Sequence, residues 1–168
     1  AVAAPTAGMH ISKQLLKRFE IKGVQTAYIT LHAGLGNFQR IEVEDLSKHK
    51  ADAEQIVIPE ETERMVNEAL DAGRRVCAVG TTVVRAMESS VTSDAHVRAC
   101  DKWTNMFIFP PYEVQIPNAM LTNFHLPKSS LMMTVASFSG LKLLKAAYET
   151  AVKEGYGFGT YGDAMLII

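Results

Sequence analysis

Strand-like and helix-like patterns alternate along this chain. Apolar runs rich in strand-forming residues occupy 24–31, 55–58, 75–79, 106–109, 119–124 and the end of the tail 156–168. Apolar residues recur at helical spacing in 11–19, 60–70, 83–90, 131–138 and 141–151. This alternation predicts an α/β fold, a mixed sheet flanked by helices.

Length and composition favour one globular unit. The chain has 168 residues, of which 48% are hydrophobic and 21% charged, so we expect a single α/β domain over 1–168. No apolar run approaches the ~20 residues of a membrane helix. Cys77 and Cys100 have no metal-type spacing, which favours a reducing compartment. We expect a cytoplasmic protein with no membrane partner.

The beginning of the chain is turn-like and apolar. It opens on Ala1–Gly8, without an initiator Met and without a signal-peptide pattern. This start is typical of the middle of a domain, and we expect a fragment or a processed chain.

Charge is distributed unevenly although the net charge is only −1. Residues 1–41 carry five bases and one acid, whereas 42–68 carry nine acids and three bases. A polyanionic partner would therefore need a local basic patch. An ordinary solvated surface is the alternative interpretation.

The richest polar pattern follows the predicted strand 119–124. Three polar side chains interrupt the apolar sequence there: Asn123, His125 and Lys128. Pro127 holds the chain extended, and Ser129 or Ser130 is placed to cap the next helix. Ligands of α/β folds bind beyond the carboxyl ends of strands, so a site is expected here. A satisfied buried histidine beside a capped helix is the alternative.

A second polar group follows the predicted strand 75–79. Thr81, Thr82 and Arg85 come directly after Gly80, at the start of a predicted helix. Free backbone N–H groups, hydroxyls and an arginine suit a carboxylate or phosphate, although the spacing is not that of a P-loop. The alternative is a helix that one threonine caps.

Two glycines follow the predicted strand 24–31. Gly34 and Gly36 allow a tight turn and close approach of the backbone to a ligand. As a dinucleotide motif the pattern is incomplete, because the third glycine is missing. A plain turn is the alternative.

Histidines and the last strand complete the candidates. The five histidines show no paired spacing for a metal ion, so none is expected. Tyr161 and Asp163 stand at the start of the last strand, from which they can reach a site. Asp163 alternatively serves only to satisfy a turn.

Five stretches, taken together, resemble one known family. They are Ala4–His10, Thr30–Phe38, Val79–Arg85, Leu121–Ser129 and Tyr161–Leu166. In this order they are similar to the S-adenosylmethionine:tRNA ribosyltransferase-isomerases of queuosine biosynthesis, the QueA family. The resemblance implies a larger α/β domain with a small β-barrel domain inserted in it. This chain matches only the C-terminal portion, without the inserted domain.

The resemblance also implies a reaction. Family members transfer the ribosyl part of S-adenosylmethionine to 7-aminomethyl-7-deazaguanine at the tRNA wobble position. They isomerise it to the epoxy-cyclopentane of epoxyqueuosine and release adenine and methionine. S-adenosylmethionine and tRNA are thus the implied partners, with S-adenosylmethionine consumed as a substrate and no separate cofactor.

This chemistry needs proton transfer and fixed polar groups. The candidate catalytic residues are His10, His125 and Asp163. His32 is a further candidate for proton transfer, because imidazole titrates near neutrality. Tyr161 or Phe124 would stack on a base or face the sulfonium. The candidate substrate-binding residues are Thr6, His32, Gly34, Gly36, Thr81, Thr82, Arg85, Asn123, Lys128 and Tyr161.

One departure from the family pattern keeps alternatives open. Ala51-Asp-Ala-Glu54 stands where the family usually carries Met-His-Ser/Ala-Glu, so Asp52 replaces a histidine. A paralogue with a different acceptor is one alternative. The other is a non-catalytic module that binds S-adenosylmethionine or RNA.

Overall fold

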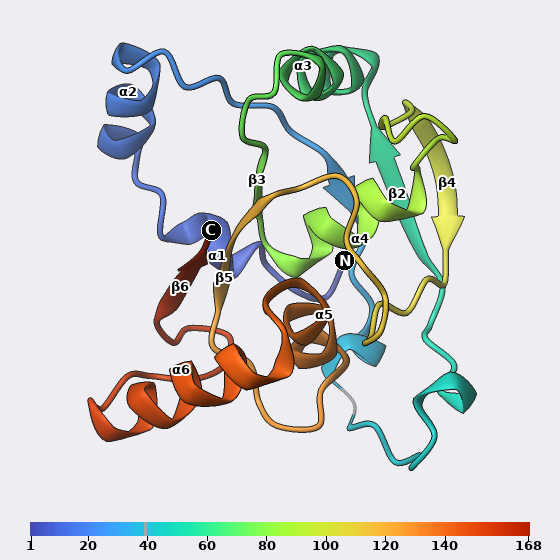
Figure 1. Ribbon diagram of the computed structural model, residues 1–168, viewed down its shortest axis with the longest axis vertical. Helices are drawn as coiled ribbons and strands as arrows, with labels where there is room; N and C mark the ends of the chain where they lie inside the picture. Colours follow the sequence, from blue (N-terminus) through green and yellow to red (C-terminus); the bar gives the residue numbers. More distant parts are fainter. Residues whose placement is uncertain (39) are drawn as a thin grey trace.

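The computed structural model describes residues 1–38 and 40–168 (Figure 1). The helices are α1 (Thr6–Met9), α2 (Lys13–Ile21), α3 (Glu60–Asp71), α4 (Thr81–Ser89), α5 (Ser130–Ser139) and α6 (Leu141–Lys153). The strands are β1 (Thr30–Leu31), β2 (Glu54–Ile58), β3 (Cys77–Val79), β4 (Cys100–Thr104), β5 (Ala119–Asn123) and β6 (Ala164–Ile167). Two short 3-10 helices, η1 (Leu35–Phe38) and η2 (Leu46–Lys48), lie between β1 and β2.

The described strands form two three-stranded sheets. The predicted α/β class is confirmed, but the strands form two sheets where one mixed sheet was expected. In the first sheet the order is β1-β2-β4, with both pairs antiparallel. In the second the order is β3-β5-β6, with β3 and β5 parallel and β5 and β6 antiparallel. The carboxyl ends of β3 and β5 therefore meet at one edge, and β6 starts there, since Asn123 pairs with Ala164.

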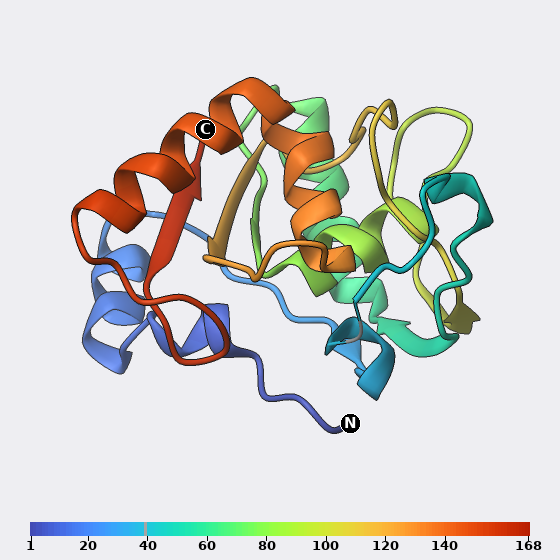
Figure 2. The same cartoon turned by 90° about the horizontal axis from the view of Figure 1, so that it is seen from below.

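Helix α4 joins the two sheets, because it contacts strands of both. Its Val84 is fully buried in the core of the second sheet, whereas Ala86 and Met87 pack in the core of the first. The apolar side chains of one helix thus point into two hydrophobic clusters. Helices α5 and α6 pack on each other on one side of the second sheet, and α1 lies on the other side (Figure 2).

Local sequence signals explain several helix limits. The Ser12 hydroxyl accepts the Leu15 N–H at 3.1 Å, and the Ser129 hydroxyl accepts the Met132 N–H at 3.2 Å. Both serines are the N-caps of their helices, as their residue type favours. Gly140, with φ of 77°, separates α5 from α6, because only glycine adopts that conformation at no cost.

Two predicted strands are wrong in whole or in part. Of the run 24–31 only Thr30–Leu31 pairs, with β2, and 24–28 are exposed. The run 106–109 forms no strand; its Ile108 is a buried core residue. The second strand that pairs with β2 is β4, a charged segment that sequence patterns missed. Strand propensity takes effect only where a partner strand is present.

Within the described part of the chain, no helix is long and apolar enough to cross a bilayer.

Candidate functional site

Four polar segments meet at the carboxyl edge of β3 and β5. Gly80 follows β3, with its N–H bonded to the Leu121 carbonyl at 2.8 Å. The loop 124–129 follows β5, and the loop 157–163 leads into β6 at the same edge. Helix α1 completes the group, because a Cβ on Gly80 would lie 3.9 Å from the Ala7 Cβ. This is the edge where α/β folds bind ligands.

Asn123 is the centre of the first group of contacts. Its side chain is buried, and Oδ1 accepts the Thr6 hydroxyl at 3.1 Å. Its Nδ2 lies 3.0 Å from the Gly162 carbonyl and 3.1 Å from His10 Nε2. Because the amide nitrogen is the donor in both contacts, His10 Nε2 is an acceptor and its proton lies on Nδ1. The predicted residues Thr6, His10 and Asn123 are thus brought together.

His125 lies beside this group, and its imidazole is largely buried. Burial lowers the pKa of His125 from 6.5 to about 4. Its Nε2 lies 2.8 Å from the Thr122 hydroxyl, and its backbone N–H donates to the Tyr148 hydroxyl at 2.8 Å. The imidazole is therefore neutral at pH 7, which suits hydrogen bonding better than proton donation.

Asp163 closes the glycine-rich loop before β6. Its Oδ2 accepts the Gly157 N–H at 2.7 Å, and its own N–H donates to the Gly157 carbonyl at 2.9 Å. Its carbonyl accepts the Phe124 N–H at 3.2 Å. These contacts match the alternative in which Asp163 satisfies a turn. The carboxylate already has a backbone partner that a base would have to release.

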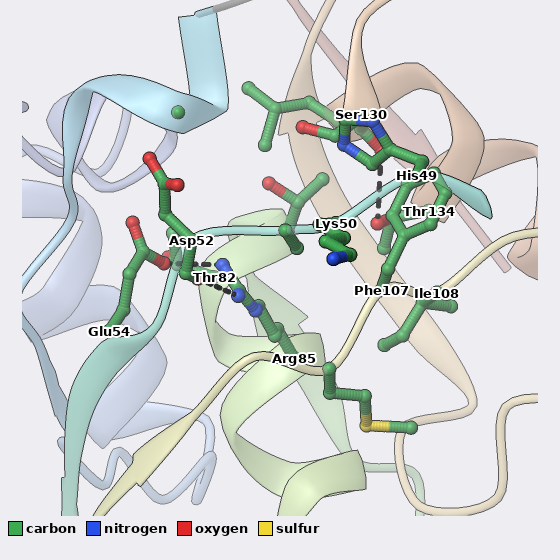
Figure 3. A pocket seen from close by; sticks show the side chains of 15 residues that line it. His49, Lys50, Asp52, Glu54, Thr82, Arg85, Phe107, Ile108, Ser130 and Thr134 are labelled. Carbon is green, nitrogen blue, oxygen red and sulfur yellow. Dashed lines mark hydrogen bonds and ion pairs between the residues drawn. The ribbon is translucent and has the colours of Figure 1, made fainter. Parts of the chain in front are cut away.

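The second group of predicted residues lines a cavity of about 40 Å³ between α4, α5 and the segment 49–52 (Figure 3). Helix α4 contributes Thr81, Thr82 and Arg85, and α5 contributes Ser130 and Thr134. The remaining lining residues are Gly36, His49, Lys50, Ala51, Asp52, Glu54, Met106, Phe107, Ile108 and Leu131. A volume of this size holds a water molecule or the end of a small polar group.

Arg85 is engaged inside the protein. Its Nη1 forms an ion pair with Glu54 Oε2 at 2.5 Å, with side chains 12% and 2% exposed respectively. Its Nη2 donates to the Asp52 carbonyl at 2.9 Å. Burial lowers the pKa of Arg85, and Glu54 opposes this shift; arginine stays charged in proteins. The guanidinium expected to bind an anion is thus paired with a carboxylate.

The two predicted glycines lie against Glu54 and Asp52, two residues that contact Arg85. The Gly34 N–H donates to Glu54 Oε1 at 2.6 Å. A Cβ on Gly36 would lie 2.8 Å from Asp52 Cγ, closer than side chains pack, and 3.2 Å from Asp52 Cβ. We expected these glycines to let the backbone approach a ligand. In the structure they let it approach Glu54 and Asp52.

Other predicted residues lie outside these two groups. The backbone of His32 bonds to the Gln55 carbonyl at 2.9 Å, while its side chain is exposed. Lys128 is exposed, with φ of 62°, and its carbonyl accepts the Ile41 N–H at 2.8 Å. Tyr161 is 81% exposed. Phe124 is 5% exposed and packs edge-on against Tyr148, so the idea that it stacks on a base is wrong.

Sequence reasoning missed Glu54, which links Arg85 to Gly34. One signal was present: in β2, buried and half-buried positions alternate, and Glu54 occupies a buried one. An acid on the buried face of a strand needs a partner. Among the described residues, no group of three His, Cys, Asp or Glu side chains is placed to hold a metal ion.

Fold and site together define an α/β protein with a polar site at the carboxyl edge of two parallel strands. A family model described as queuosine biosynthesis protein matches residues 1–167. The S-adenosylmethionine:tRNA ribosyltransferase-isomerase of Bacteroides fragilis is 60% identical over 168 residues, all of this chain and 48% of that protein. The corresponding protein of Natranaerobius thermophilus is 46% identical over 167 residues.

A crystal structure of S-adenosylmethionine tRNA ribosyltransferase from Thermotoga maritima agrees with the fold. Its TM-score is 0.78 at 37% identity, over 96% of this chain and 51% of that chain. The chain therefore belongs to the queuosine biosynthesis protein family, the QueA family. It spans about half the length of the curated relatives it matches.

Proposed function

We propose that this chain forms part of an S-adenosylmethionine:tRNA ribosyltransferase-isomerase. In this proposal it helps transfer the ribosyl moiety of S-adenosylmethionine to 7-aminomethyl-7-deazaguanine at the tRNA wobble position, giving epoxyqueuosine, adenine and methionine. The observation that carries the proposal is the Asn123 group. It joins Thr6 and His10, from the first stretch of family resemblance, to the fourth stretch at a ligand-binding edge. Relatives that carry this name match the whole chain.

Within this function, His10 is the proposed proton-transfer residue. The reaction needs a proton donor for the departing adenine, and the His10 Nδ1–H is the ring group left free for this role when Nε2 accepts from Asn123. Asn123 orients the His10 ring through Nε2, and the side chain is otherwise exposed. His125, neutral at pH 7, and Asp163, bonded to Gly157, suit positioning roles.

The proposal includes tRNA and S-adenosylmethionine as partners and the cytoplasm as location. Cys77 and Cys100 are free thiols, as is typical of reducing compartments. The exposed Tyr161 and Lys128 are available to nucleic acid, through stacking and phosphate contact respectively.

Adenine release tests the function. S-adenosylmethionine and tRNA bearing 7-aminomethyl-7-deazaguanine are incubated with this chain and, separately, with the full-length gene product. Chromatography detects adenine, and mass spectrometry detects the gain on the tRNA base. We expect both from the full-length product. A folded full-length protein that binds S-adenosylmethionine but releases no adenine would instead identify a binding module.

A further inference from the structure

The Glu54 side chain contacts both Gly34, in the segment after β1, and helix α4. One carboxylate oxygen accepts the Gly34 N–H at 2.6 Å, and the other pairs with Arg85 Nη1 at 2.5 Å. Glu54 stands at the first position of β2, where it is 2% exposed. A buried carboxylate is stable only when it is paired and hydrogen-bonded, and both oxygens of Glu54 meet this condition.

Arg85 extends the connection to the segment before β2. Its Nη2 donates to the Asp52 carbonyl at 2.9 Å and lies 3.4 Å from the Thr104 carbonyl. One guanidinium thus binds the Glu54 side chain, the backbone just before β2 and the last carbonyl of β4. Because the fork of arginine is planar and rigid, these contacts fix its orientation.

The connected segments form one side of the cavity. Gly36, Asp52, Glu54, Thr82 and Arg85 all line it, and Figure 3 shows Asp52 and Glu54 on the same side of the guanidinium. Asp52 lies so close to Gly36 that a side chain at position 36 would collide with it. The segment 34–36 and helix α4 are thus linked through the carboxylate of Glu54.

We infer that Glu54, through Arg85 and Gly34, is a positioning residue of the substrate site. It neutralises Arg85 and holds the segment 34–36, so that the cavity wall formed by Gly36, Glu54 and Arg85 keeps a fixed shape. The predicted effect on KM rests on the proposed function, whereas the predicted protection of Gly34 does not. The positioning role of Glu54 also replaces the expectation that Arg85 itself holds a substrate anion.

Kinetics of the full-length gene product test the role. Glu54→Gln keeps the size of the side chain and removes its charge. We expect the KM for S-adenosylmethionine to rise about tenfold or more and kcat to stay within about threefold, because binding geometry changes while no proton-transfer group does. Glu54→Asp, which keeps the charge, should recover part of the loss.

Glu88→Gln is the matched control. Glu88 is also a buried glutamate, 5% exposed, whose carboxylate accepts the Gln115 and Ile116 N–H groups at 3.0 and 2.9 Å. It lines no part of the cavity. We expect this variant to lower Tm without changing KM. Equal rises of KM in both variants, or an unchanged KM in Glu54→Gln, would overturn the proposal.

Hydrogen exchange of the wild-type protein gives a test that needs neither activity nor a variant. The Gly34 amide should exchange at least about 100-fold more slowly than an unprotected amide, as expected for a charge-assisted bond to a buried carboxylate. Fast exchange of Gly34 would overturn the positioning role, whatever the assays show. A protected Gly34 in a protein without adenine release would instead refute only the proposed function.

Discussion

The amide of Asn123 contacts the imidazole of His10 at 3.1 Å, although 113 positions separate them in the chain. The same amide accepts the Thr6 hydroxyl and donates to the Gly162 carbonyl. Three segments that are distant in sequence are thus held by one buried side chain. Its loss should therefore affect both stability and activity.

Asn123→Ala should lower the free energy of unfolding by about 1–3 kcal/mol, because it removes the hydrogen bonds of a buried side chain to Thr6, His10 and Gly162. Adenine release should fall by about 100-fold, because His10 loses the group that orients it. Urea unfolding and the adenine assay measure the two effects.

Asn67→Ala is the control for that variant. Asn67, on α3, exchanges two hydrogen bonds of 2.9 Å with the backbone of Val97. Its loss should reduce stability by about 1–3 kcal/mol and leave kcat and KM unchanged. If both variants reduce adenine release equally at a temperature where both are folded, Asn123 has no special place in the site.

His125 predicts a pH dependence of stability. Its pKa is about 4 in the folded protein and near 6.5 when unfolded, so the unfolded chain binds more protons between these values. Its contribution is complete above pH 6.5 and is lost as pH falls toward 4. Between pH 7 and pH 5 the free energy of unfolding should decrease by about 2 kcal/mol from this residue.

The control for this prediction is His125→Gln, which lacks the titrating imidazole and so its contribution to the pH dependence of the free energy of unfolding. Subtracting its pH profile from that of the wild type removes the titration of other groups. An NMR titration that shows protonation of His125 near pH 6.5 in the folded protein would contradict the prediction.

Gly36→Ala should destabilise the protein by about 0.5–1.5 kcal/mol, because the new methyl group forces the exposed Asp52 side chain out of its preferred rotamer. Asp52→Gly removes the obstructing atoms, so in the double variant most of this loss should disappear. Thermal unfolding of the two single variants and the double variant gives the coupling energy. Additive losses would show that Gly36 is needed for another reason.

Tyr112 reports on the buried carboxylate of Glu88. Its hydroxyl donates to Glu88 Oε2 at 2.7 Å, and burial together with Glu88 raises the pKa of Tyr112 to about 12. In Glu88→Gln the pKa of Tyr112 should fall but stay above 10, because burial is the larger cause. Ultraviolet titration of the phenol measures this, and an unchanged value would show that the contact is absent in solution.

Much of the fold follows from sequence patterns alone. The helices correspond to α2 to α6, because each carries an apolar stripe and three are followed by Gly23, Gly73 or Gly155. The strands β2, β3, β5 and β6 were predicted from their apolar runs. The α/β class followed from the alternation of strand and helix patterns. The family could be recognised from the long polar motifs at the ends of strands.

Only the tertiary structure decided the rest. Strand β4 is charged, and it is a strand because β2 lies beside it; the run 106–109 has no partner strand and is not one. The predicted site residues separated into an Asn123 group and an Arg85 group. Arg85 proved to pair with Glu54, a residue 31 positions away. Local sequence determines which groups are available, but burial and long-range pairing determine their partners and charges, and these arise only when the chain is folded.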